Sequence, residues 1–175
     1  MDKDELSEIL EQHRVWLEYN GMSGERADLC FRDLSGVDLF RADLYRANLS
    51  GAIISEADLY KADLVGANLF GADLYKTNLK EANLTKAKLS RANLTRANLS
   101  DAKLPMASLG RANLSKADLS RANLSGADLF ETDLFETTLV NANLTRANLY
   151  RARLSDALII NNNYLLGCSL GATRS

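Results

Sequence analysis

A leucine recurs at every fifth residue along most of this chain. Twenty-seven consecutive positions at this spacing, from Leu29 to Ile159, hold Leu with only two exceptions, Ile54 and Ile159, and no insertion or deletion interrupts them. The residue two places before each of these positions is mostly Ala, and the residue directly before it is usually Asp or Asn. The two residues that follow are polar, charged, Gly or aromatic. This period constrains the fold more than any other feature of the chain.

A five-residue apolar period fits neither of the regular secondary structures. An α-helix turns by about 100° per residue, so leucines five residues apart would be scattered around its surface. A flat strand would place them alternately on its two faces. The chain must therefore turn a corner in every repeat if all the leucines are to share one interior.

Four such pentads close a square coil of twenty residues. All leucine side chains then point to the axis, and successive coils stack through backbone hydrogen bonds at roughly 4.8 Å. The twenty-seven pentads make about six to seven coils. Ala fits the second inward position, which has no room for a larger side chain, and Asp or Asn can hydrogen-bond to the backbone of a tight turn. The expected core includes Leu29, Leu49, Leu69, Leu89, Leu94, Leu129 and Leu149.

The pattern A(D/N)LXX resembles that of the pentapeptide-repeat family, over residues 27 to about 161. The resemblance implies an all-β fold, a right-handed quadrilateral parallel β-helix. We therefore divide the chain into an N-terminal capping helix (residues 1–21), a pentapeptide-repeat β-helix (residues 22–161) and a C-terminal cap or tail (residues 162–175).

Residues 3–20 follow a helical period instead. Their apolar positions are spaced by three or four residues, which is typical of an amphipathic helix, and Gly21 is a plausible stop. We expect this helix to cover the open end of the first coil, because repeat proteins need caps at their ends. The expected capping residues are Leu6, Leu10 and Trp16.

The register breaks in the C-terminal tail. Tyr164 stands where a leucine is expected, and Leu165, Leu166 and Cys168 follow it. The tail either folds over the last coil, with Tyr164 and Leu166 as capping residues, or meets the same tail of a second molecule across a two-fold axis. The second alternative would make a homodimer through the C-terminal end.

The composition excludes several classes of protein. Apolar residues make up 46% of the chain and charged residues 25%, which is ordinary for a soluble globular protein. No apolar run is long enough to span a membrane. The N-terminus is acidic and lacks the basic start and apolar middle of a secretory signal, so we expect a cytoplasmic protein. Cys30 and Cys168 lie near opposite ends of an elongated fold and are expected to be reduced thiols.

Few residues offer catalytic chemistry. His13 is the single histidine, and Cys30 would be its most accessible partner in a nucleophilic dyad. However, His13 lies on the apolar face of the predicted helix, where a packing role is expected. Zinc-type clusters and nucleotide-binding motifs are absent from the sequence, so we predict a protein that is not an enzyme and that uses no cofactor.

Pairs of aspartates stack at the twenty-residue spacing, and together they could bind a hard cation such as calcium. Asn fills the same slots elsewhere, which favours hydrogen bonding within the turns instead. The four carboxylates are Asp38, Asp58, Asp43 and Asp63.

The surface slots carry the remaining candidates for function. Phe130 and Phe135 lie on adjacent sides of one coil, and Tyr150 lies one coil beyond Phe130. These rings either form an interaction site or stack in cross-coil ladders that stiffen the rod. Bases outnumber acids in the middle coils and could attract an anionic partner, but no aromatic residue interleaves with them, which disfavours nucleic acid. The basic candidates are Arg91, Arg96, Arg111 and Lys116.

The predicted function is that of a non-catalytic interaction module, a rigid rod that presents flat faces to an unknown protein partner. The resemblance implies one alternative, since some pentapeptide-repeat proteins imitate duplex DNA and modulate DNA gyrase. Residues 1–20 carry six acids and two bases, a charge of −4, so the other 155 residues sum to +2 within the total of −2. A near-neutral, centrally basic rod lacks the acidic field that such mimicry needs.

Overall fold

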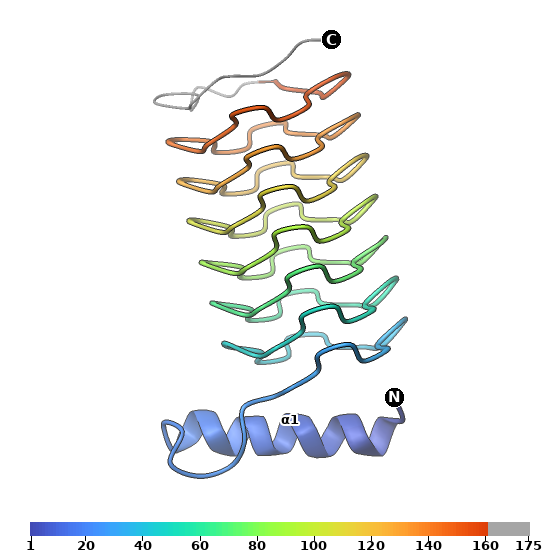
Figure 1. Cartoon of the computed structure of the whole chain (residues 1–175), viewed down its shortest axis with the longest axis vertical. Coiled ribbons are helices and arrows are strands. Elements are labelled where there is room, and N and C mark those ends of the chain that lie inside the picture. The colour runs from blue at the N-terminus through green and yellow to red at the C-terminus, as the bar shows by residue number, and fades with distance from the viewer. Residues whose placement is uncertain (161–175) are drawn as a thin grey trace.

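The chain folds as a stack of coils with a helix at one end (Figure 1). The computed structural model describes residues 1–160. Helix α1 spans Lys3–Glu18. Parallel bridges then join residues twenty apart along the whole stack, from Asp28 with Asn48 to Thr138 with Leu158. Within the described part of the chain, no helix is both long enough and apolar enough to cross a membrane.

Backbone hydrogen bonds between coils follow the same twenty-residue repeat. The Leu94 N–H donates to the carbonyl oxygen of Asn113 (2.7 Å), and the Asn113 N–H donates to that of Ala92 (2.9 Å). The Ala97 N–H bonds back to the carbonyl oxygen of Leu94 (3.0 Å) and closes a turn. Because each pentad turns so soon, its side of the coil contributes one bridging residue and no extended strand within residues 1–160. The fold is thus a parallel β-helix of isolated bridges, with less regular strand than an all-β class implies.

Each turn places one residue in the left-handed region of the backbone. This residue is the second after the leucine, as at Met106 (φ 58°), Arg96 (φ 60°) and Gly66 (φ 66°). A positive φ at the third residue of a turn is the mark of the type II turn, and it costs an L-residue about 1–2 kcal/mol. Glycine or a side chain that is not branched at Cβ fills this slot in the described turns, and Val, Ile or Thr never does.

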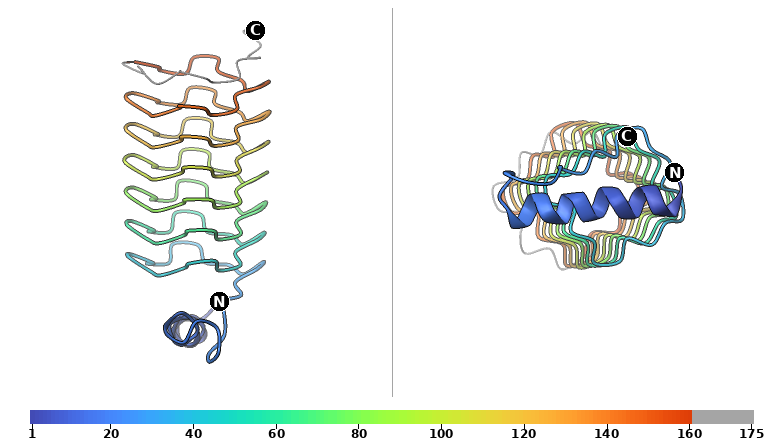
Figure 2. Two further views of the ribbon diagram at one scale, coloured as in Figure 1. Left: turned by 90° about the vertical axis from the view of Figure 1, so that its left-hand side faces the viewer. Right: turned by 90° about the horizontal axis from the view of Figure 1, so that it is seen from below.

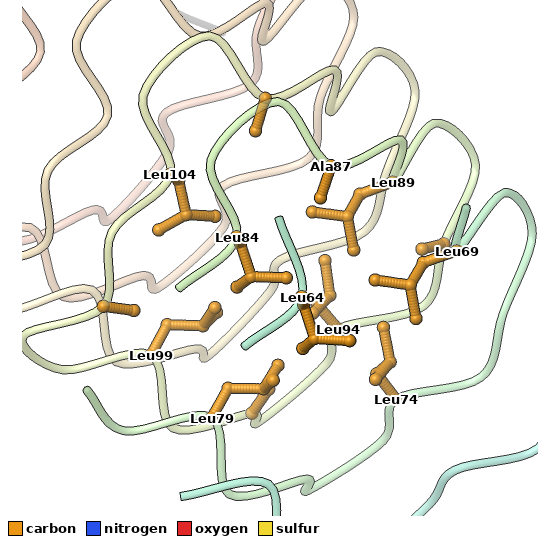
Figure 3. Close-up of a cluster of buried hydrophobic side chains, with 14 of the residues drawn as sticks. Leu64, Leu69, Leu74, Leu79, Leu84, Ala87, Leu89, Leu94, Leu99 and Leu104 are labelled. Carbon is orange, nitrogen blue, oxygen red and sulfur yellow. The ribbon is translucent and has the colours of Figure 1, made fainter. Parts of the chain in front are cut away.

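The leucine side chains point inward and are almost completely buried (Figure 3). Leu84 and Leu104, from successive coils, lie in one column, and Ala87 occupies the smaller space at the corner. Seven leucines sample the length of this core and are each at most 1% exposed: Leu29, Leu49, Leu69, Leu89, Leu94, Leu129 and Leu149.

Some inward slots that usually hold Ala contain polar residues. The buried Thr77 donates its hydroxyl to the carbonyl oxygen of Ile54 (2.7 Å), and Thr132 and Thr137 make equivalent bonds. Arg32 holds the slot in the first coil, where it is exposed and pairs with Glu5 of α1 (2.9 Å). The arginine is tolerated because this end of the core faces the helix rather than another coil.

Helix α1 lies across the open end of the first coil (Figure 2). Asp2 caps its N-terminus by accepting a hydrogen bond from the Glu5 N–H (2.7 Å). Leu6 is buried on the first coil, and Leu10 packs half-buried beside it. The chain returns toward the first coil past Gly24 (φ 69°), where an added Cβ would collide with the backbone of α1.

The remaining capping predictions concern Trp16 of α1 and the C-terminal tail. Trp16 is half-buried and stacks on His13, with ring centroids 5.6 Å apart. Tyr164 and Leu166, and with them the two alternatives for the C-terminal tail, lie outside the described residues.

Replacing Leu94 by Lys tests the filled interior. We expect the free energy of unfolding to fall by several kcal/mol, because an ammonium group would be buried without a partner between neighbouring coils. Chemical denaturation followed by circular dichroism measures the change. Thr95→Lys adds the same charge one residue later on the outer side and should cost little. An undiminished cooperative transition in Leu94→Lys would contradict the coil architecture.

Replacing Met106 by Val tests the turn conformation. A β-branched residue is poorly accommodated at φ 58°, so we expect Val to lower the free energy of unfolding by about 1 kcal/mol or more. Met106→Gly, which accepts this φ without strain, serves as the control and should unfold later than the Val variant. Equal stability of the two variants would show that the positive φ imposes no strain.

Candidate functional site

The structure separates His13 from any nucleophilic chemistry. His13 is a residue of α1, and its imidazole is fully buried. Its Nδ1 accepts a hydrogen bond from the Ala27 N–H (3.1 Å). Hydrogen bonding to the Asp28 carboxylate raises the pKa of the Cys30 thiol, and partial burial raises it further. A cysteine nucleophile needs a lowered pKa to supply thiolate, so neither residue is prepared for catalysis.

The stacked aspartates serve the turns. Asp38 and Asp58 are bridge partners, and each accepts a hydrogen bond from the backbone N–H two residues later. Asp43 and Asp63 repeat this arrangement on the next side. Within residues 1–160, no three His, Cys, Asp or Glu side chains gather in a way that could hold a metal ion. The proposed joint cation site therefore does not form in the described structure.

The aromatic residues form short ladders across coils. Phe130 stacks on Tyr150 with ring centroids 6.1 Å apart and planes inclined by 11°. Phe40 stacks on Tyr60 in the same way near the N-terminal end (5.7 Å). Tyr150 remains 45% exposed, whereas Phe130 and Phe135 are half-buried. Phe130 and Tyr150 therefore form a cross-coil ladder, as one of the two predictions has it, and Tyr150 still exposes ring surface that an interaction site would need.

Guanidinium groups cover the same rings. Arg111 lies over Phe130 (5.9 Å from its centroid), and Arg151 lies over Tyr150 (5.3 Å). Glu131 joins these two arginines, at 2.8 Å from Arg111 and 3.3 Å from Arg151. The carboxylate therefore holds both cations beside the aromatic ladder.

Phe135, on the adjacent side, has a cation of its own. The Arg153 guanidinium lies 4.8 Å from the Phe135 ring centroid and pairs with Asp133 at 3.2 Å. We call the combined surface the aromatic–arginine surface, which comprises Phe130, Phe135, Tyr150, Arg111, Arg151 and Arg153.

Three of the four basic candidates of the middle coils have partners on neighbouring coils, which an inspection along the chain misses. Lys116 pairs with Glu136 (3.5 Å), as Arg111 pairs with Glu131, and the Arg91 guanidinium lies 5.8 Å from the Phe70 ring centroid. Arg96 has no ion pair in the described part of the chain. The acids come from the next coil, twenty residues away, so a comparison of bases with acids within the middle coils alone overstates the positive charge of this surface.

Comparison with protein families gives one match. The family model described as pentapeptide repeats matches eight copies, over residues 25–60, 33–69, 62–101, 92–129 and 127–159. These matches cover the described coils almost from end to end. No curated protein matched the chain significantly.

Several solved structures are similar to the chain. HetL, a pentapeptide repeat protein involved in heterocyst differentiation regulation from the cyanobacterium Nostoc sp. strain PCC 7120, is 36% identical, with 83% of this chain and 77% of that chain covered and a TM-score of 0.43. A pentapeptide repeat protein from the thylakoid lumen of Arabidopsis thaliana is 35% identical, with 53% and 64% covered and a TM-score of 0.52. QnrB1, a plasmid-mediated fluoroquinolone resistance protein, is 18% identical, with 83% and 85% covered and a TM-score of 0.46.

The buried imidazole predicts that acid destabilises the cap. Burial lowers the pKa of His13; Arg26 lowers it too, against the opposing charge of Asp43. The unfolded chain therefore binds a proton near the ordinary pKa of 6.5 while the folded chain does not, so stability falls as the pH drops below that value. We expect the Tm of the wild type to fall more steeply between about pH 7 and pH 5 than that of His13→Gln. Equal slopes in the two proteins would contradict this assignment.

Proposed function

Because the chain belongs to the pentapeptide-repeat family, we propose that it acts as a non-catalytic module that binds another protein through the aromatic–arginine surface. The family's right-handed β-helix supplies a stiff support, and the leucine core leaves no interior space for a substrate. His13 and Cys30 are the residues with the most obvious nucleophilic chemistry. His13 is buried, and the pKa of the Cys30 thiol is raised. The coils therefore act through their outer faces.

The observation that carries this proposal is the Phe130–Tyr150 ladder with its two covering arginines. Aromatic residues and Arg are enriched among the residues that dominate the energy of protein interfaces. Here the stacked rings and the Glu131 bridge hold these side chains in place before any partner arrives. Such preorganisation lowers the entropy cost of binding.

The surface also indicates the chemistry of the partner. Ring surface on Tyr150 fits an apolar contact, while Arg111, Arg151 and Arg153 surround the rings with positive charge. A protein that presents an apolar side chain bordered by carboxylates would complement both.

DNA mimicry remains the less favoured alternative. The charge of residues 21–175 is +2, and the corners of the coils pair bases with acids, as at Arg121 with Asp101 (2.6 Å). A surface that balances its own charges in this way offers no continuous row of negative charge to imitate a phosphate backbone.

A pull-down from a lysate of the native host tests the aromatic–arginine surface. The wild type is compared with the double variant Phe130→Ser, Phe135→Ser. We expect a protein that the wild type retains and that the double variant loses at least about tenfold, because both rings and their cation contacts are removed.

A matched double variant, Phe40→Ser and Phe70→Ser, makes the same change on the earlier coils, where both rings are 47% exposed. It should retain the partner, and thermal melts should show that both double variants are folded. Equal retention by the wild type and Phe130→Ser, Phe135→Ser would exclude this surface. Capture of DNA gyrase alone would favour the alternative.

A further inference from the structure

One corner of the coils differs from the other three in charge. It consists of the turn residues twenty apart that begin at residue 26, and in the described structure it contains four bases and no acid. None of these bases forms an ion pair within residues 1–160. The bases are Arg26, Arg46, Lys86 and Arg146, and Gly66, Met106 and Gly126 fill the remaining places.

The other three corners each contain acids that pair with bases on neighbouring coils. Glu131 binds both Arg111 and Arg151 at one of them. The second has pairs between residues 56 and 76 and between 116 and 136, and the third has pairs between 61 and 81 and between 101 and 121. Such exposed pairs add little stability, but they offset part of the positive charge of these corners. The basic corner differs because it has no acid at any of its described positions.

A cleft opens beside the basic corner at its N-terminal end, on the early coils. Its volume is about 470 Å³. Bases from three different coils line it, together with two amides, the hydroxyl of Ser50 and a glycine, and no carboxylate does. The principal lining residues are Arg26, Arg46, Lys88, Asn48, Asn68 and Gly66.

Gly66 keeps this part of the corner open. It takes the turn slot between Arg46 and Lys86 with a φ of 66°, and an added Cβ would lie 3.4 Å from the Arg46 Cγ. Any larger residue would extend into the space between the two bases. Glutamate is compatible with this backbone, because Glu131 occupies the same turn slot at φ 53°.

The amides make the wall of the cleft a donor surface. The Asn68 amide donates to Asn48 Oδ1 (3.2 Å), and the Asn48 amide donates to Asp28 (2.9 Å). Both amide oxygens also accept from backbone N–H groups, at Ser50 and Phe70, so their orientation is set. Each amide nitrogen has a second N–H beyond the bond it makes along the ladder.

Nearby groups leave the cations available. Glu25 and Asp28 are the acids nearest to Arg26 in sequence, and neither forms an ion pair with it in the described structure. Asp28 accepts hydrogen bonds from Asn48 and from the Cys30 backbone. The Arg46 guanidinium carbon lies 5.1 Å from the Tyr45 ring centroid, and a ring contact of this kind occupies none of the carboxylate-binding geometry of the guanidinium donors. Lys88 is exposed and follows Asn68 as its bridge partner on the next coil.

From these contacts we infer that the cleft lined by Arg26, Arg46 and Lys88 binds the phosphate group of a small molecule. Three cations and spare amide donors around one polar space match the charge and the acceptor oxygens of a phosphoryl group, which arginine binds in a bidentate manner. The lining is mostly polar, so recognition rests on the charged group rather than on an apolar body. This site lies on the early coils and is independent of the aromatic–arginine surface.

Calorimetric titration of the full-length protein with inorganic pyrophosphate tests the inference. We expect saturable binding to the wild type and a loss of at least about tenfold in Gly66→Glu. The new carboxylate would stand between Arg46 and Lys86 as Glu131 stands between Arg111 and Arg151, and it would occupy the cations that the phosphate needs. Lys88→Gln, which leaves the turn unchanged, should also weaken binding.

Gly126→Glu is the matched control, since it makes the same change at the same corner and at the same φ of 66°, far from the cleft. It should bind pyrophosphate like the wild type. Absence of saturable binding to the wild type, or equal weakening in both glutamate variants, would overturn the inference. Binding of an oligothymidylate that Arg146→Gln and Lys88→Gln weaken equally, without binding of pyrophosphate, would assign the corner to nucleic acid instead.

Discussion

The structure depends on a backbone hydrogen bond from each core position between Leu29 and Leu139 to the carbonyl oxygen nineteen residues later. At Leu94 this bond goes to Asn113, and the return bond from Asn113 to Ala92 locks the two coils in register. A shift of the register by one residue at Leu94 would remove the leucine from the interior and place the polar Asn93 or Thr95 there. Burial of the leucines and pairing of the backbone therefore require the same spacing, and each supports the other along the whole stack.

This bond also decides which surface residues are neighbours. Side chains twenty residues apart meet on adjacent coils, so Asn78 donates to Asp58 (2.8 Å) and Arg121 binds Asp101 through two hydrogen bonds of 2.6 Å. The side chains that share a face are consequently those spaced twenty residues apart. At this spacing three corners contain both acids and bases, and the fourth, through Arg46 and Lys86, is basic throughout its charged positions.

Most of the coil could be predicted from the sequence, because the leucine period is incompatible with any other regular arrangement and the Asp or Asn slot has an evident use in turns. The positive φ at Arg96 or Met106 could not be predicted, since long side chains are uncommon in the left-handed region of the backbone. The absence of Val, Ile and Thr from that slot was the available signal. The ion pairs of Arg111 and Lys116 were missed because charge was counted along the chain rather than across coils. Arg32 breaks the Ala pattern for a reason that only the position of α1 reveals.

The separation of core from surface explains how one repeat can support different functions at different heights. Each coil contacts only its neighbours, so a change at an outward slot alters the local face without disturbing the distant coils. The leucines are nearly invariant, whereas the slot after them ranges from Ser50 to Phe130 and the turn slot from Gly66 to Glu131. Gly66 therefore leaves a cleft open on the early coils, and Glu131 pairs with two arginines on the later coils. The rod is best understood as a rigid support on which separate binding surfaces are placed by substitutions that leave its backbone unchanged.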